Sequence, residues 1–155
     1  MEITERTTGL RKRVTIKQVE NEDFKILTKK RFWFSWKTCN NLSVIYKLQI
    51  DGEDDILGVI SLIEWPVEKR VEIKLLASSS ENSGQNKLYT GIAGCLIAFA
   101  CRLALEKYGR EACVSLIPKT GLIKHYMNNY YMKHGGRQLY IDEKELIQLI
   151  KEYSA

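Results

Sequence analysis

The chain contains little cysteine or histidine, and neither residue type is arranged as a metal site. Its four cysteines, at positions 39, 95, 101 and 113, show no CxxC spacing and no paired framework. Cys95, Cys101 and Cys113 fall in apolar segments, where a free thiol behaves as a small hydrophobic side chain. His125 and His134 are isolated and lack the spacing of metal ligands. These patterns argue against a disulfide scaffold and a metal site, and they favour a reducing compartment.

Long hydrophobic runs are also missing. The longest, Ile92–Cys101, is too short to span a bilayer. The first residues, Met1–Glu5, lack the basic flank and apolar core of a secretory signal. We therefore expect a cytoplasmic protein that makes no membrane contact.

Charge of one sign does not dominate either. The net charge of +5 comes from 24 basic and 19 acidic residues, which favours an anionic cofactor or partner but falls short of a nucleic-acid-binding signature. Apolar residues make up 45% of the chain and charged residues 28%, as in ordinary globular proteins. The length of 155 residues predicts one domain, 1–155, that is large enough to bury a core.

The hydrophobic pattern predicts alternating strands and helices. Expected strands are Val14–Val19, Leu42–Ile50, Ile56–Trp65, Val71–Ala77, Ala112–Ile117 and Arg137–Ile141. Expected helices are Phe24–Trp36, Gly91–Tyr108, Thr120–Tyr131 and Glu143–Tyr153, and Gly135-Gly136 is expected to break the chain. The order predicts an α/β domain, in which an antiparallel meander is followed by β-α-β-α and helices pack on a mixed sheet.

A turn of small residues opens the most apolar of these helices. Gly91, Ala93 and Gly94 follow a strand and a polar loop, and they begin the segment Gly91–Tyr108. Backbone N–H groups at such a helix start are unpaired, and the helix dipole favours an anion beside them. The turn therefore predicts a phosphate-binding site that needs no particular side chain.

This combination of strand, loop and turn resembles the GNAT family of acyl-CoA-dependent N-acetyltransferases, over about residues 56–141. The family carries a diphosphate loop of the form Gln/Arg-x-x-Gly-x-Gly/Ala, which Gly91 and Ala93 match, while Leu88 replaces the basic or amide residue. The resemblance implies a GNAT-like fold that binds acetyl-CoA. The residues that it assigns to the cofactor are Leu75, Leu76, Ala77, Tyr89, Thr90, Gly91, Ala93, Gly94 and Lys119.

The resemblance also implies three catalytic candidates. Glu72 is similar to the strand glutamate that some members use as general base, and Glu64 at the end of the preceding strand is the second candidate. The chemistry needs such a group because an amine is protonated at neutral pH and cannot attack a thioester in that form. Tyr126 corresponds to the family tyrosine near the cofactor sulfur, which would protonate the departing thiolate. The expected reaction is direct transfer of an acetyl group to a primary amine.

The acceptor and two other functional classes stay open. The acceptor amine could belong to a small molecule, a protein or an aminoacyl-tRNA, and a homodimer is allowed. A non-catalytic acyl-CoA-binding module would keep the turn without productive acid and base groups. A small basic nucleic-acid-binding domain would instead show steeply salt-dependent binding. The aromatic run Phe32–Trp36 is expected in the core, with the lining of an acceptor pocket as the alternative.

Overall fold

A computed structural model describes residues 1–36 and 43–154. Within them, strands form one mixed nine-stranded sheet in the order β6-β1-β2-β3-β4-β5-β7-β9-β8. The neighbours run antiparallel except β5 and β7, which are parallel. The strands are β1 (Glu2–Glu5), β2 (Arg11–Gln18), β3 (Val44–Ile50), β4 (Ile56–Trp65), β5 (Arg70–Ser78), β6 (Tyr89–Thr90), β7 (Cys113–Leu116), β8 (Lys133–Gly135) and β9 (Gln138–Asp142).

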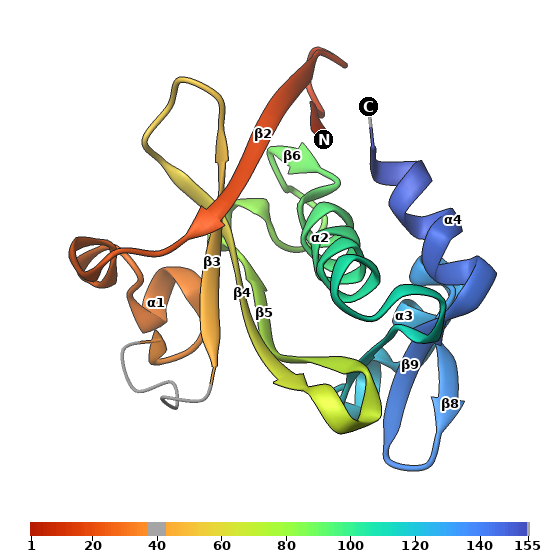
Figure 1. The fold of residues 1–155 in the computed structure, drawn as a ribbon. Coiled ribbons are helices and arrows are strands. Elements are labelled where there is room, and N and C mark those ends of the chain that lie inside the picture. The colour runs from red at the N-terminus through yellow and green to blue at the C-terminus, as the bar shows by residue number, and fades with distance from the viewer. Residues whose placement is uncertain (37–42, 155) are drawn as a thin grey trace.

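Helices cover both faces of this sheet. The α-helices among the described residues are α1 (Lys29–Phe32), α2 (Ile92–Tyr108), α3 (Ile123–Tyr130) and α4 (Glu143–Tyr153). Figure 1 shows a strongly curled sheet, with α2 and α4 on its inner side and α1 on the opposite side of β3 and β4. The larger core cluster joins the apolar helix α2 to α4 and the sheet, and a smaller one lies between the α1 segment and strands β3–β5. The mixed α/β fold expected from the sequence is confirmed.

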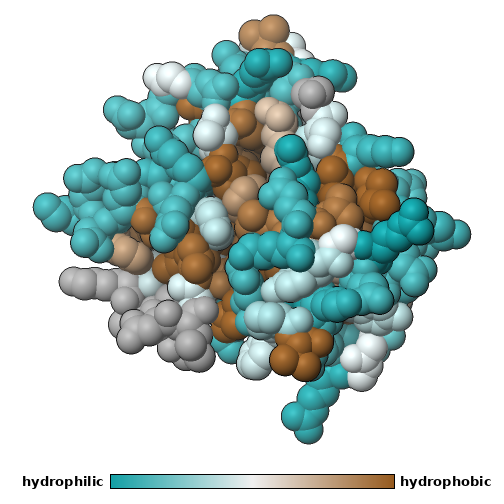
Figure 2. All heavy atoms as spheres, viewed as in Figure 1, coloured by the Kyte–Doolittle hydropathy of each residue, from teal (hydrophilic) through white to brown (hydrophobic). Residues whose placement is uncertain are grey.

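The outer flank of α2 is incompletely covered. Figure 2 shows mostly polar side chains on this face of the molecule, with apolar side chains exposed in a hollow between β2 and α2. The hollow is lined by Met1, Val14, Thr15, Ile16, Phe99, Arg102, Leu103 and Glu106. No helix in the described part of the chain is long and apolar enough to cross a membrane.

The predicted helix Phe24–Trp36 is wrong. The segment instead forms a 3₁₀ helix, Asn21–Lys25, and then the four-residue α1. The hydroxyl of Thr28 accepts a hydrogen bond from the Arg31 amide and starts α1 as its N-cap. Trp33 adopts a left-handed conformation (φ 70°) and ends it. The helical spacing of apolar residues persists across two short helices because both pack on the same sheet face.

Three strands were not predicted as such. β1, β6 and β8 contain two to four residues each, too few for a period-two pattern. They form through pairing with distant segments, for example Thr4 with Thr90. Gly135-Gly136, predicted as a break, lies where β8 ends: Gly135 is the last residue of β8, and Gly136, with φ 69°, is in the turn to β9. The start of the predicted strand Leu42–Ile50 and the thiol of Cys39 lie outside the described residues.

The middle of β5 contains a β-bulge that changes which face its side chains occupy. Leu62 pairs with Ile73 and Ser61 with Leu75, so the register skips Lys74. Val71 and Ile73 belong to the α2 core, as period-two alternation predicts. Beyond the bulge, Leu76 continues on that side, while Leu75 and Ala77 pack in the α1 cluster. The bulge therefore re-aims the half of β5 that faces the candidate site described below.

A buried ion pair fixes the segment before α1 to the sheet. Lys47 on β3 donates to the Asp23 carboxylate at 2.7 Å, and both side chains are at most 9% exposed. The Glu20 amide also donates to Asp23 at 2.7 Å. Burial alone would raise the pKa of Asp23, but these two donors outweigh it and hold the pKa below its ordinary value. Because of this pair, the position of α1 depends on the sheet.

We predict that Asp23→Asn lowers the free energy of unfolding by about 3 kcal/mol, because Lys47 is then left buried without a counter-charge. Urea unfolding measures this, with Asp55→Asn as the control, since the Asp55 side chain is 56% exposed and its pair contributes little. The stabilisation by Asp23 is present above the ordinary carboxyl pKa and is lost as pH falls through its lowered pKa. Equal acid sensitivity in wild type and Asp23→Asn would contradict this assignment.

Candidate functional site

A cleft of about 500 Å³ opens where β5 and β7 separate. The two strands are paired from Arg70 and Cys113 up to Ile73 and Leu116, and then β7 ends while β5 continues to Ser78. Their separation leaves one edge of β5 facing the cleft. The lining is formed by Trp33, Phe34, Ile73, Lys74, Leu75, Leu76, Ala77, Ser78, Asn82, Ser83, Gly84, Lys87, Ala93, Leu116, Ile117, Pro118, Lys119, Leu122, His125, Tyr126 and Tyr130.

One end of the cleft is built from the loop after β5 and the start of α2. Ser83 and Gly84 line it together with Ala93 in the first turn of α2. Asn82 organises this loop, since its side chain accepts from the Tyr89 amide and donates to Ser79, each at 2.9 Å. The Ser83 hydroxyl donates to the Ser79 carbonyl at 3.1 Å. Small residues, a fixed loop and the positive end of a 17-residue helix suit a phosphate group.

Salt bridges hold this loop against α1. Arg31 on α1 contacts Glu81 in the loop and also Asp55, at 2.5 and 2.8 Å. These carboxylates raise the pKa of the Arg31 guanidinium, and burial opposes this. Trp33 adds a hydrogen bond from Nε1 to the Ser78 carbonyl at 3.0 Å. The loop and the α1 wall of the cleft therefore form one connected unit.

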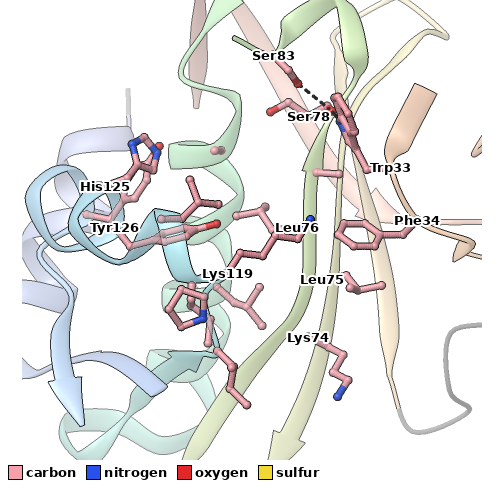
Figure 3. Close-up of a pocket in the computed structure, with 18 of the residues that line it drawn as sticks. Trp33, Phe34, Lys74, Leu75, Leu76, Ser78, Ser83, Lys119, His125 and Tyr126 are labelled. Carbon is pink, nitrogen blue, oxygen red and sulfur yellow. Dashed lines mark hydrogen bonds between the residues drawn. The ribbon is translucent and has the colours of Figure 1, made fainter. Parts of the chain in front are cut away.

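The middle of the cleft contains the phenol of Tyr126 and the ammonium group of Lys119. Figure 3 shows the Tyr126 hydroxyl directed from α3 toward Leu76 on β5. Lys119 extends from the end of β7, and its Nζ lies 5.2 Å from the centre of the Phe34 ring on the opposite wall. Burial raises the pKa of Tyr126 above its ordinary value, so the phenol keeps its proton near neutral pH and can act as a donor.

The structure brings six of the residues assigned from the sequence into this cleft. They are Leu75, Leu76, Ala77, Ala93, Lys119 and Tyr126. Of the others, Tyr89 and Thr90 pair with β1, and Thr90 and Gly91 line a separate hollow beside Tyr153. Gly94 lies directly under the Tyr153 ring of α4, so close that a Cβ would come within 2.1 Å of it. The first turn of α2 is thus divided between the cleft and the packing of α4.

Neither carboxylate candidate lines the cleft. Glu72 lies on β5 before the bulge, where it accepts from Trp65 Nε1 at 2.9 Å and lies 3.7 Å from Arg70. Glu64 lies at the end of β4 and forms an ion pair with Lys107 of α2 at 2.5 Å. Within the described residues, no group of three His, Cys, Asp or Glu side chains could hold a metal ion.

Several lining residues were not predicted from the sequence, and for the aromatic run Phe32–Trp36 the lining of a pocket was only the alternative to the core. The aromatic run divides, since Phe32 and Trp36 are fully buried while Trp33 and Phe34 line the cleft. The left-handed conformation of Trp33 produces this division, and helical periodicity does not reveal it. Lys74 reaches the lining at the bulge, which depends on pairing with β4. The sequence predicts the polar run Asn82–Gly84 as a loop, but it does not predict that this loop lines the cleft.

The fold is similar to that of solved structures of a bacterial N-acetyltransferase. A structure of mutant forms of the spermidine/spermine N-acetyltransferase SpeG from Vibrio cholerae has a TM-score of 0.60 at 16% identity, covering 88% of this chain and 98% of that one. The structure of the same enzyme with manganese ions has a TM-score of 0.62 at 14% identity, covering 88% of this chain and 96% of that one. The dodecameric structure of the enzyme in an intermediate state has a TM-score of 0.62 at 14% identity, covering 85% of this chain and 95% of that one. No protein-family model matches the chain, and no curated protein does.

Proposed function

We propose that this chain, which has the GNAT acetyltransferase fold, transfers an acetyl group from acetyl-CoA to a primary amine. The observation that carries the proposal is the cleft between β5 and β7, in which small residues and a helix start lie at one end and a phenol whose pKa is raised by burial lies in the middle. The described lining supplies the groups that such a cofactor requires: small residues at a helix start, an extended strand edge and a proton donor. Measuring acetyl-CoA binding together with transfer to a panel of amines tests it, and binding without transfer would indicate a non-catalytic acyl-CoA-binding module.

Three parts of the chain would hold acetyl-CoA. The loop Asn82–Gly84 and the first turn of α2 at Ala93 would bind the pyrophosphate, with Lys87 nearby as a counter-charge. The edge of β5 at Leu75–Ala77 would bind the pantetheine arm like an added strand, and one of its N–H groups would stabilise the oxyanion. Tyr89, Thr90, Gly91 and Gly94 would act mainly by shaping the turn.

The proposed reaction is direct attack of the amine on the thioester, with side chains of this chain transferring the protons. The amine nitrogen attacks the thioester carbonyl carbon, so that a C–N bond forms and the carbonyl oxygen becomes an oxyanion. When the C–S bond breaks, Tyr126 gives its proton to the thiolate and regains one from solvent. Glu72 would take the amine proton through water, because its carboxylate lies outside the lining; Glu64 is the second candidate.

Ala93→Glu should abolish CoA binding, because a carboxylate at the first turn of α2 would repel the pyrophosphate and fill its site. Ala93→Gln is the matched control, since it adds similar bulk without charge, and we expect it to weaken binding less. Isothermal titration with CoA measures both, and circular dichroism checks the fold. Unchanged CoA affinity in a folded Ala93→Glu variant would show that the pyrophosphate does not bind at the first turn of α2.

Tyr126→Phe should lower kcat about 100-fold and leave the KM for acetyl-CoA nearly unchanged, because a positioned general acid contributes about this factor. Tyr131→Phe is the matched control: its hydroxyl bonds to Glu152 outside the cleft. Steady-state kinetics near neutral pH measures both variants. Wild-type turnover in Tyr126→Phe would mean that solvent protonates the thiolate.

Glu72→Gln should reduce kcat/KM most at low pH, where little acceptor amine is deprotonated and a base matters most. Glu64→Gln is the comparison variant, since Glu64 pairs with Lys107 on the other side of the sheet. The measurement is a pH–rate profile with one amine. Loss of the acidic limb only in Glu64→Gln would reassign the base, and no change in either variant would mean that the amine binds already deprotonated.

A further inference from the structure

The charges along the cleft have one sign. Its described lining contains three lysines, Lys74, Lys87 and Lys119, and no aspartate or glutamate. Lysine side chains at the phosphate end are expected in any site for a cofactor with a pyrophosphate. Only Lys87 is at that end, in the loop with Ser83 and Gly84. The other two therefore need a separate explanation.

Lys119 lies in the middle of the cleft, and Lys74 lies toward the end away from the phosphate end. Lys74 is four residues before Ser78 on β5, which corresponds to about 13 Å along a strand. Figure 3 shows Lys74 at the far end of this strand from Ser78 and Ser83, and Lys119 at the level of the Tyr126 hydroxyl. The Lys119 ammonium thus lies beside the phenol, and Lys74 lies further along β5, at the end of the cleft away from the loop Asn82–Gly84.

The neighbouring carboxylates do not neutralise these lysines. Glu72 is held by Trp65 and Arg70, and Glu81 by Arg31. Neither Lys74 nor Lys119 has a carboxylate partner among the described residues, and the contact of Lys119 with Phe34 leaves its charge uncompensated. Two positive charges without carboxylate partners, one in the middle of the cleft and one at its end, attract an anion and repel a cation.

We infer that the acceptor is an amine that carries its own anionic group, as an amino acid does, and that Lys74 and Lys119 bind this group. The inference rests on the proposed acetyl transfer and names its substrate class. A polyamine such as spermidine, the substrate named for the structurally similar enzymes, would meet only like charges here. Trp33 and Ile117, whose side chains are 51% and 66% exposed at the cleft, suit an apolar body on the acceptor.

The test compares acceptors that differ only in the anion. Phenylalanine is paired with phenylalaninamide, phosphoethanolamine with ethanolamine, and spermidine is the cationic reference. We expect kcat/KM to be at least about tenfold higher for the member of one pair that carries the anionic group, as one charge-assisted hydrogen bond allows. The pair that shows the preference identifies the anion as a carboxylate or a phosphate. Near neutral pH a larger fraction of phenylalaninamide than of phenylalanine is present as the free amine, and this difference favours the amide, against the expected result.

The second part of the test reverses the charge of each lysine. Lys119→Glu and Lys74→Glu should each reduce the preference for the anionic acceptor about tenfold or more and improve spermidine as an acceptor. Lys124→Glu, an exposed change on α3 outside the lining, is the matched control and should leave the ratio unchanged. A gain in spermidine transfer cannot come from misfolding, so this outcome is informative even if the variants are less stable.

Failure of the acceptor inference is distinguishable from failure of the proposed function. Transfer to spermidine, or to both phenylalaninamide and ethanolamine, with kcat/KM equal to or above that of the acceptors that carry an anionic group would overturn the inference while acetyl transfer stands. Absence of transfer to every amine would contradict the proposed function. In that case, titration of CoA-loaded protein with N-acetylphenylalanine and its amide decides the inference: tighter binding of the carboxylate, lost in Lys119→Glu, supports it, and equal binding overturns it.

Discussion

The candidate site depends on the way that β5 stops pairing on one edge while it continues on the other. The parallel contact with β7 ends at Ile73 and Leu116, whereas the antiparallel contact with β4 continues to Ser78. The bulge at Lys74 falls at this same point and exchanges the faces of the residues beyond it. An open backbone edge and a set of re-aimed side chains therefore arise at one place, and the cleft forms there.

The second wall of the cleft is held by buried and partly buried charges. The pair of Asp23 and Lys47 attaches the segment before α1 to β3, and Arg31 joins α1 to Glu81 in the loop after β5. Such pairs contribute less net stability than their short distances suggest, because desolvation opposes the attraction. Their clearer effect is to fix where Trp33 and the loop lie relative to β5. The site is positioned by interactions that themselves lie outside it.

The distribution of charge separates this cleft from its surroundings. The carboxylates Glu72 and Glu81 beside it are each paired with an arginine, while Lys74 and Lys119 at the cleft are not paired with an acid in the described chain. A weakly basic protein with a net charge of +5 could distribute that excess anywhere. That the described lining of this cleft contains three lysines and no carboxylate is a property of the fold, and it favours an anionic ligand.

The sequence by itself determined the elements whose signal is local. The strand Ile56–Trp65, the helix Glu143–Tyr153 and the apolar helix α2 were predicted nearly to the residue, because hydrophobic periodicity and turn residues act within a few positions. The resemblance to the GNAT family pointed to Ala93, Lys119 and Tyr126, and all three line the cleft. Only the tertiary structure decided the faces beyond the bulge, the short strands β1, β6 and β8, and the division of the aromatic run. These features depend on pairing and packing between segments far apart in the chain, and no local pattern records such contacts.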